Sequence, residues 1–479
     1  MTAAPTQRAF DREISTIAEY VAGHGIVSKS AFNTAHLCLL DCLGCALAAL
    51  AVPECTKMLG PVVPGTLVPH GARVPGTSYV LDPVKAAFDT GALIRWLDYN
   101  DTFYGETVVH PSDTLGAILA AADWASRTRV AGGKAPVMMR DVLDAAIRAY
   151  EIAGVLALGN AVTTRWKLDH VMLIKIACAA VVTKLLGGTR EEIGNAVSHA
   201  WIDGHALAIY RRSADTGARK SWASADAGAR GVSLALLALR GETGCAGALA
   251  APTWGFQDVC ARGERLAIAR PYGSYVMENV QFKLAYPAAF HAQTAAEAAI
   301  SLHAQVRDRL DEIERVELWT HGYALAYLAR SGVLRNFAER DHCLQYIAAV
   351  GLIFGDLRAG DYEDDVAGDP RIDRLREKMT VSEDERATRG FLDARKRSNA
   401  NAVRVHFRDG SATPRVDVEY PIGHPRRRHA ALPLMMQKFD AGLARVYPPL
   451  RRVQVARMCG DRGQLCALPV HEFMDALAL

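Results

Sequence analysis

Apolar residues recur at spacings of three and four through most of residues 1–274, the pattern of helices that bury one face. It predicts helices over residues 14–22, 29–50, 83–97, 114–125, 139–158, 171–186 and 225–239. Ser28 and Asp141 are placed to cap helix starts, and Thr189 with Glu192 forms a capping box that opens a further helix. No segment repeats at a fixed period, so we expect a large all-helical domain rather than a solenoid.

The pattern changes near Pro271, where alternating apolar and polar positions predict strands. The predicted strands are residues 312–320, 402–407 and 415–420, the last two joined at Asp409–Gly410, and helical patterns lie between them at 288–306 and 343–354. After Pro421 the helical spacing returns at 432–446 and 470–477. We therefore predict a mainly α fold: a large all-helical domain (residues 1–274), a smaller α+β domain (275–410), and a C-terminal segment (411–479) that returns to the helical domain.

Length and composition agree with this division and narrow the class of protein. A chain of 479 residues is too long for one ordinary core, and half of its residues are hydrophobic. The net charge of +3 gives no broad field for nucleic acid or membrane. The basic run Arg426–Arg428 and the charge-rich stretch 356–389 are therefore interpreted as solvated surface, rather than as an RNA or phosphate site.

The N-terminus carries no apolar signal core, so we expect no export. The longest apolar stretch, residues 37–52, is interrupted by Asp41 and is shorter than the ~20 residues of a membrane span. These features favour a cytoplasmic protein with neither a membrane nor a nucleic-acid partner.

Ten cysteines raise the question of a metal cofactor. Cys38, Cys42 and Cys45 lie on one stripe of a predicted helix, and three thiols there suggest an iron–sulfur cluster. Cluster ligands usually come from short loop runs, however, whereas these lie in an Ala/Leu helix where cysteine behaves as a small hydrophobic residue. We favour the core interpretation, a reduced compartment and no metal.

Nucleotide-binding, zinc-hydrolase and serine-hydrolase motifs are absent, and what remains are polar clusters beside apolar helices. The densest runs from Arg95 through Asp98 and Thr102 to His110 and Asp113. Buried together, such groups require partners, so they fit a cleft. They fit a capped helix end equally well.

Four further clusters carry chemistry, although simple helix caps explain several of them. They are Asp169–His170, Arg211 to Lys220, Phe282 to Pro287, and Asp341 to Tyr346. Together they suit a polyanionic acid. Removing a proton next to a carboxylate creates an enolate-like dianion that needs positive groups, and a leaving hydroxide needs a proton donor.

Several long segments give this chain its resemblance to a known family. RWLDYNDT with HPSD downstream, DHVMLIKIACAA, FKLAYPAAFHAQTAAEAA and DHCLQYIAAVGLIFGDLRAGDYED resemble the MmgE/PrpD family, most closely its branch that dehydrates 2-methylcitrate. The resemblance implies the two-domain fold predicted above, a homodimer and a small tricarboxylate substrate. It also implies formation of 2-methyl-cis-aconitate in propionate breakdown without an iron–sulfur cluster or other cofactor.

Carried over by position, the resemblance implies one pocket formed by Asp98, Thr102, His110, His170, Lys220, Lys283 and Tyr346. We assign Lys220 and Lys283 to substrate carboxylates. His110 and His170 are candidates for proton transfer, Asp98 orients or tunes one of them, and Tyr346 is a candidate proton donor.

The spacing from Thr102 to His110 is longer than in the cis-aconitate decarboxylase branch, which favours loss of water. Phe103 departs from the tryptophan common in the dehydratase branch and leaves substrate choice open. Alternatives on the same fold are a citrate dehydratase, a cis-aconitate decarboxylase and an epimerase. An alternative from another class is a non-catalytic binding protein.

Overall fold

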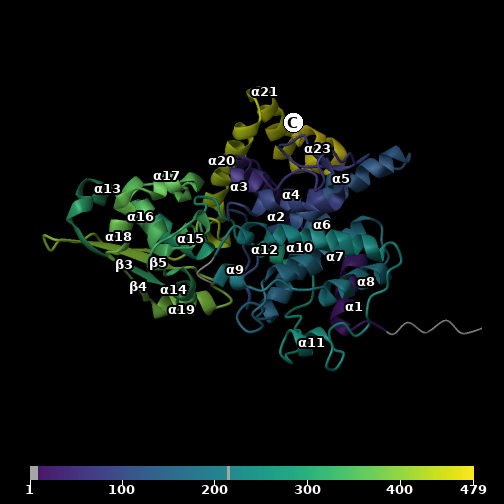
Figure 1. Cartoon of the computed structure of the whole chain (residues 1–479), viewed down its shortest axis with the longest axis horizontal. Helices are drawn as coiled ribbons and strands as arrows, with labels where there is room; N and C mark the ends of the chain where they lie inside the picture. Colours follow the sequence, from purple (N-terminus) through teal and green to yellow (C-terminus); the bar gives the residue numbers. More distant parts are fainter. Residues whose placement is uncertain (1–8, 213–215) are drawn as a thin grey trace, which may run out of the picture.

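The computed structural model describes residues 9–212 and 216–479. It is mainly helical and forms two bodies, a larger helical one and a smaller one that contains a sheet (Figure 1). The larger hydrophobic core takes its side chains from residues 14–284 and 431–477, and the smaller core takes them from residues 288–407. Two separate cores divide the chain into two domains, as its length predicts.

The helical domain is built around long apolar helices. Its elements are α1 (Arg12–Gly23), α2 (Lys29–Ala49), α3 (Pro53–Thr56), β1 (Ala72–Arg73), β2 (Val80–Leu81), α4 (Pro83–Arg95), η1 (Pro111–Thr114), α5 (Leu115–Ala131), α6 (Met139–Gly159), α7 (Val171–Leu185), α8 (Arg190–Ile202), α9 (Ile209–Arg212), α10 (Arg219–Ala238), α11 (Phe256–Val259) and α12 (Tyr275–Asn279). Ser28 caps α2, and Thr189 with Glu192 closes the predicted capping box at α8. The helices predicted from spacing are confirmed, most of them to within two residues at each end; α5 ends six residues later than predicted and α10 begins six residues earlier.

Helices α4, α5, α7 and α10 pack together closely and position the site. A Cβ atom on Gly116 of α5 would lie 2.5 Å from the backbone nitrogen of Gly91 on α4, so only glycine allows this approach. As a result, the C-terminal end of α4 and the N-terminal ends of α7 and α10 meet in one region.

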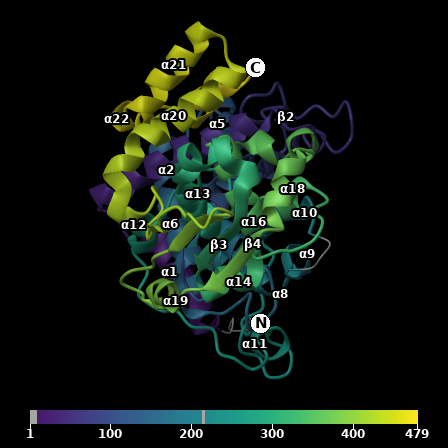
Figure 2. The ribbon, with the colours of Figure 1, turned by 90° about the vertical axis from the view of Figure 1, so that its left-hand side faces the viewer.

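The smaller domain contains a four-stranded sheet in the order β4-β3-β5-β6. Its elements are η2 (Phe290–Ala292), α13 (Gln293–Val306), η3 (Arg307–Glu312), β3 (Ile313–Thr320), α14 (Gly322–Leu328), α15 (Phe337–Arg340), α16 (Leu344–Phe354), η4 (Ala359–Tyr362), α17 (Asp364–Ala367), α18 (Pro370–Arg376), β4 (Met379–Glu383), α19 (Glu385–Leu392), β5 (Asn401–Phe407) and β6 (Val416–Val418). Figure 2 looks onto this domain, with β3 and β4 in front of the helical domain.

The three predicted strands are present, and β5 pairs antiparallel with β6 across the Asp409–Gly410 turn. Strand β4 was not predicted. It lies in the charge-rich stretch 356–389, which we interpreted as surface only. It pairs in parallel with β3 as an edge strand whose side chains are exposed or half-buried, so no apolar alternation marks it.

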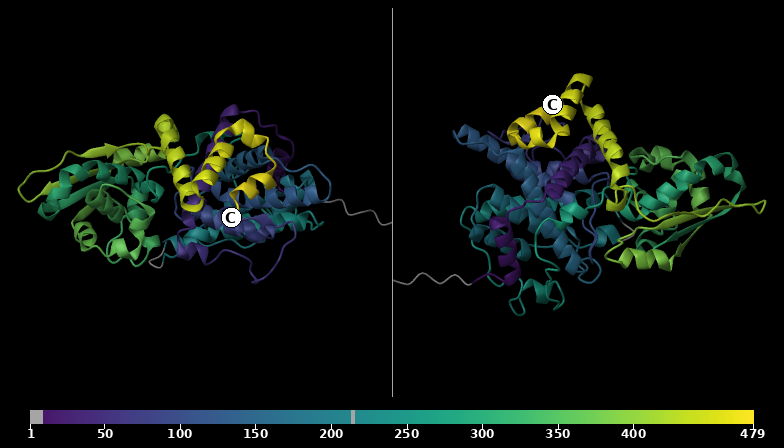
Figure 3. Two further views of the ribbon diagram at one scale, coloured as in Figure 1. Left: turned by 90° about the horizontal axis from the view of Figure 1, so that it is seen from above. Right: turned by 180° about the vertical axis from the view of Figure 1, so that it is seen from behind.

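The C-terminal helices lie against the helical domain, as the views from above and from behind show (Figure 3). They are η5 (Pro425–Arg427), α20 (Arg428–Val446), α21 (Pro449–Gly460), α22 (Arg462–Cys466) and α23 (Val470–Leu477). Lys438 of α20 reaches Asp41 of α2 at 2.6 Å, which explains an acid inside an apolar run. Residues 276–284 belong to the larger core, and β6 belongs to the smaller sheet. The boundaries at 275 and 411 stay a prediction.

Helix α2 is apolar and long enough to span a membrane by composition alone. In its most apolar window, 78% of the residues are buried inside the molecule, where α2 packs against α4, α6 and α20. It is therefore a core helix. Burial raises the pKa of Cys38 and Cys42 well above the usual range, which favours the thiol form over the thiolate that binds metals.

The basic run has structural contacts of its own. Arg427 pairs with Glu297 at 2.9 Å, and Arg428 donates to the carbonyl of Val280 at 2.7 Å. These bonds tie the start of α20 to both domains.

Candidate active site

Asp98 is the centre of a buried charged cluster just after α4. It has a left-handed backbone, with φ of 47°, which costs about 1 kcal/mol for a residue with a side chain. Its carboxylate pairs with Arg95 and accepts from Nζ of Lys283 at 2.7 Å, and Lys283 also donates to the Asp98 carbonyl at 2.6 Å. Burial alone would raise the pKa of Asp98, but Arg95 and Lys283 hold it well below its usual range.

A second ion pair joins the two domains beside the first. Lys220, in the first turn of α10, donates to Asp341 of the smaller domain at 2.5 Å. His342 lies 2.7 Å from Asp341 through Nδ1 and 3.6 Å from Asp98 through Nε2. Because a carboxylate only accepts, Nδ1 of His342 carries the proton and donates it to Asp341. His342 thus lies between both carboxylates.

His110 lies next to this cluster, in the loop that leads into α5. Its Nδ1 is 2.7 Å from the carbonyl of Asp101 and 2.8 Å from Oγ1 of Thr102. The carbonyl can only accept, so Nδ1–H donates and Nε2 is left with the lone pair. Burial, followed by the charges of Arg95 and Lys283, lowers the pKa of His110 well below its usual range. The ring is therefore neutral and basic at Nε2.

His170 precedes α7 and lies opposite His110, with the ring centroids 5.5 Å apart. Its Nδ1 is 3.2 Å from Asp169, whose other oxygen accepts from Arg211 at 2.7 Å. Arg211 lowers the pKa of Asp169 to about 2, although burial acts in the opposite direction. This carboxylate stays ionised and favours a proton on the neighbouring imidazole.

Tyr346 is placed differently from the other predicted residues. It lies on α16, buried in the smaller core, and its hydroxyl donates to the carbonyl of Asp361 at 2.6 Å. The structure therefore brings six of the seven predicted residues together and places Tyr346 behind them, bonded within its own domain.

Sequence reasoning missed two groups of the site and undervalued one. The cluster from Asp341 to Tyr346 was considered for chemistry or for a helix cap, and only Tyr346 was assigned to the pocket. The N-cap of α16 is Cys343, and the side chains of Asp341 and His342 both reach across to the helical domain. Arg95 was placed in the densest cluster without a role of its own, and its charge acts on both Asp98 and His110. The available signal was an acid next to a histidine, which sequence alone does not distinguish from a cap.

Asp101 supports the site from behind. It accepts from the hydroxyls of Ser112 at 2.6 Å and Tyr150 at 2.7 Å, and burial raises its pKa to about 7. These bonds fix the loop that carries both Thr102 and His110.

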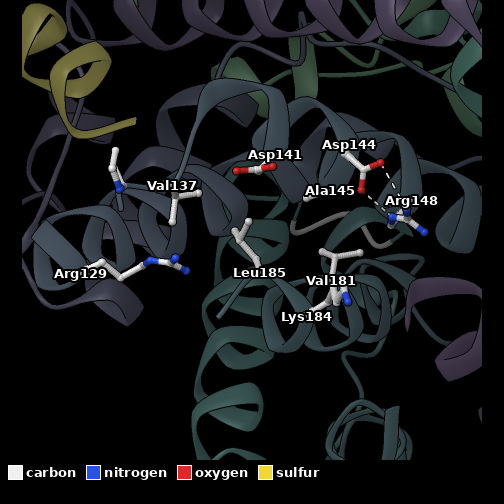
Figure 4. Close-up of a pocket in the computed structure, with 10 residues that line it drawn as sticks. Arg129, Val137, Asp141, Asp144, Ala145, Arg148, Val181, Lys184 and Leu185 are labelled. Carbon is white, nitrogen blue, oxygen red and sulfur yellow. Dashed lines mark hydrogen bonds and ion pairs between the residues drawn. The ribbon is translucent and has the colours of Figure 1, made fainter. Parts of the chain in front are cut away.

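Two cavities are lined by residues of both domains. One of about 630 Å³ is lined by Trp96, Phe337, Asp341 and Tyr362 among others, and a second of about 330 Å³ is lined by Arg211, Arg330, Arg335 and Glu339 among others. A third cavity, between α5, α6 and α7, contains none of the predicted residues, and its Asp144 and Arg148 pair with each other (Figure 4). The junction between the domains is therefore the candidate active site.

Asp98, Asp341 and His342 form a group, within residues 9–212 and 216–479, whose ligand atoms lie within 4.8 Å of one another. Arg95, Lys220 and Lys283 already neutralise these carboxylates. A divalent cation there would have to displace them or be repelled by them. The geometry thus favours amine and guanidinium partners over a metal.

The fold and the site define a class: a two-domain protein with paired histidines and buried lysines at the domain junction, suited to acid–base chemistry on a small polyanionic acid. Comparison with known proteins agrees with this class. The family model described as the MmgE/PrpD N-terminal domain matches residues 15–269, and the one described as the MmgE/PrpD C-terminal domain matches residues 286–461.

Similar proteins match over nearly the whole chain. A 2-methylcitrate dehydratase of Salmonella typhimurium is 53% identical over 97% of each chain, and one of Cupriavidus necator is 50% identical over 98% of this chain and 97% of its own. The mitochondrial 2-methylcitrate dehydratase of Yarrowia lipolytica is 46% identical over 97% of this chain and 90% of its own. The chain belongs to the MmgE/PrpD family.

Proposed function

We propose that this protein is a 2-methylcitrate dehydratase, which eliminates water from 2-methylcitrate to give 2-methyl-cis-aconitate in propionate catabolism. The observation that carries the proposal is the neutral His110 close to Lys283, with Lys220 in the same charged cluster, in a chain whose relatives bear that name. The longer Thr102–His110 connection supports dehydration over decarboxylation.

In the first step, Nε2 of His110 takes a proton from the carbon next to a substrate carboxylate. The Asp101 carbonyl and Thr102 hold the other nitrogen, so the ring presents Nε2 to the ligand. Its low pKa keeps the ring unprotonated before substrate binds.

In the second step, negative charge moves onto the carboxylate as an enolate-like dianion, and the adjacent C–OH bond breaks. Lys220 and Lys283 stabilise this charge from within a buried site, where electrostatic interactions are stronger than in water. The departing hydroxide takes a proton from His170, whose imidazolium Asp169 stabilises, or from Tyr346, and leaves as water. The electron pair of the C–H bond ends in the new double bond.

Citrate differs from 2-methylcitrate by one methyl group, and such a difference is worth about 1–3 kcal/mol in a pocket. We therefore propose turnover of citrate as well, at lower kcat/KM. A homodimer, a cytoplasmic location and the absence of nucleic-acid partners complete the proposal on the basis of family resemblance, composition and near-neutral net charge.

The test is ultraviolet absorbance of the conjugated double bond, with chelator-treated protein and 2-methylcitrate, then citrate. We expect turnover of both, with preference for 2-methylcitrate, and loss of about 10²-fold or more in His110→Gln. The matched control is His429→Gln, an exposed histidine on α20, with unchanged rate. Turnover of cis-aconitate but of neither dehydratase substrate would overturn the proposal in favour of the decarboxylase.

A further inference from the structure

The buried cluster at the domain junction is balanced in charge without any ligand. Its cations are Arg95, Lys220 and Lys283. Its carboxylates are Asp98, Asp341 and Asp113, the last lying 3.7 Å from Arg95 with a pKa raised by burial to about 6. A tricarboxylate adds three negative charges to this balanced set. A trianion needs further positive groups, because unpaired buried charge is costly.

The adjoining cavity of about 330 Å³ brings two guanidinium groups together from both domains. Arg330 is the further positive group, and Arg211, whose charge Asp169 balances, offers an unused N–H donor. Arg211 comes from the helical domain, and Arg330 comes from the smaller domain after α14. Arg211 has a side chain only 11% exposed and is fixed by bonds to Asp169 and to the carbonyl of Lys220 at 2.8 Å. It therefore connects this cavity directly with the catalytic cluster.

The two guanidinium groups have unused hydrogen-bonding capacity. Nη2 of Arg211 is buried and has no hydrogen-bond partner, and the Arg330 guanidinium has neither an ion pair nor a hydrogen bond within the part of the chain that the structure describes. Arg335, on the same wall, is neutralised by Glu339 at 3.1 Å. Buried donors without acceptors are rare in native proteins, and planar guanidinium groups match carboxylate geometry.

We propose that the cavity between Arg211 and Arg330 is a subsite for one carboxylate of a tricarboxylate ligand, the arm that points away from the two histidines. The proposal rests on the proposed function and names a determinant of its substrate class. Lys220 and Lys283 bind the carboxylates nearer the reacting carbons, and the Arg211–Arg330 subsite selects for a third acid group. Arg211 and Arg330 come from different domains, so the subsite exists only where the two domains meet.

The test is calorimetric binding of tricarballylate, a tricarboxylate that lacks the hydroxyl and cannot be dehydrated, to the full chain. We expect one molecule bound per chain. In Arg330→Gln the affinity falls about 10- to 100-fold, the size typical of a charge-assisted hydrogen bond, with an unchanged melting temperature. In Arg330→Lys, which keeps the charge but loses the planar guanidinium group, the affinity for tricarballylate falls by an intermediate factor.

The matched control is Arg386→Gln, which removes an exposed arginine of the same domain on α19. Unchanged affinity in Arg330→Gln, or a loss no larger than in the control, would overturn the subsite. Two molecules per wild-type chain, reduced to one in Arg330→Gln, would make the cavity a separate anion site and also overturn it.

Measurements of turnover distinguish a failure of the subsite proposal from a failure of the proposed dehydratase function. With 2-methylcitrate, Arg330→Gln raises KM about 10-fold or more and changes kcat less than two-fold, because Arg330 contacts no reacting atom. Wild-type protein that binds tricarballylate through Arg330 yet dehydrates nothing would refute the dehydratase and keep the subsite. Normal dehydration with an unchanged KM in Arg330→Gln would refute the subsite and keep the dehydratase.

Discussion

Replacing Lys283 by methionine is the sharpest perturbation of the site. Methionine keeps the length of the side chain and removes the ammonium group, which donates to Asp98 Oδ1 at 2.7 Å and to the Asp98 carbonyl at 2.6 Å. Breaking a fully buried ion pair costs about 3–5 kcal/mol. Asp98 keeps Arg95 as a partner, so we expect the lower end, about 3 kcal/mol of unfolding free energy.

The effect on catalysis is separate from the effect on stability. Lys283 stabilises the dianion, and removal of one such group costs about 10²- to 10³-fold in kcat. The charge of Lys283 also lowers the pKa of His110, so in Lys283→Met the acid limb of the kcat/KM profile moves to higher pH. Replacing a merely structural residue would change the free energy of unfolding but would leave the acid limb of the kcat/KM profile where it is.

The assay combines ultraviolet turnover between pH 5 and 9 with denaturant unfolding of the same samples. The matched control is Lys85→Met, which removes a partly buried ion pair with Asp89 at the far end of α4. We expect the control to lose stability and keep both kcat and the position of the limb. Normal turnover in Lys283→Met, or an unmoved acid limb, would refute the charge-stabilising role.

Three further outcomes follow from the same geometry. Burial lowers the pKa of Lys283 to about 8, so kcat/KM declines above pH 8 as the ammonium loses its proton; in Lys283→Arg, which stays protonated, this alkaline limb disappears from the pH profile. Tyr346→Phe lowers kcat about 10²-fold if the hydroxyl is the proton donor; normal kcat with about 1 kcal/mol less stability would assign it to the Asp361 bond alone. Chelator treatment and Cys42→Ala both leave turnover unchanged; loss of activity in either would restore the iron–sulfur alternative.

Local patterns accounted for most of the helical domain. The spacing of apolar residues located α2, α4, α6 and α7, because each buries a continuous apolar face in the larger core. The same reasoning failed at β4, whose edge position allows polar side chains on both faces. The spacing of apolar residues reveals an element only where one of its faces is buried, and an exposed edge strand has no such face.

The site was predicted unevenly for a related reason. Asp98, Thr102 and His110 lie close in sequence, so their clustering was visible. Asp341 and His342 meet Lys220 more than a hundred residues away, across the domain junction. Local spacing cannot distinguish a helix cap from a partner that only the tertiary fold supplies.

The buried ion pair between Lys220 and Asp341 makes the stability of the domain junction depend on salt. Separating the domains returns a buried ammonium and a buried carboxylate to water, where mobile ions screen them, whereas the closed pair is screened much less. Added salt therefore shifts the balance toward the separated arrangement. We therefore expect the junction between the domains to become less stable as ionic strength rises, through an ion pair that bulk solvent does not reach.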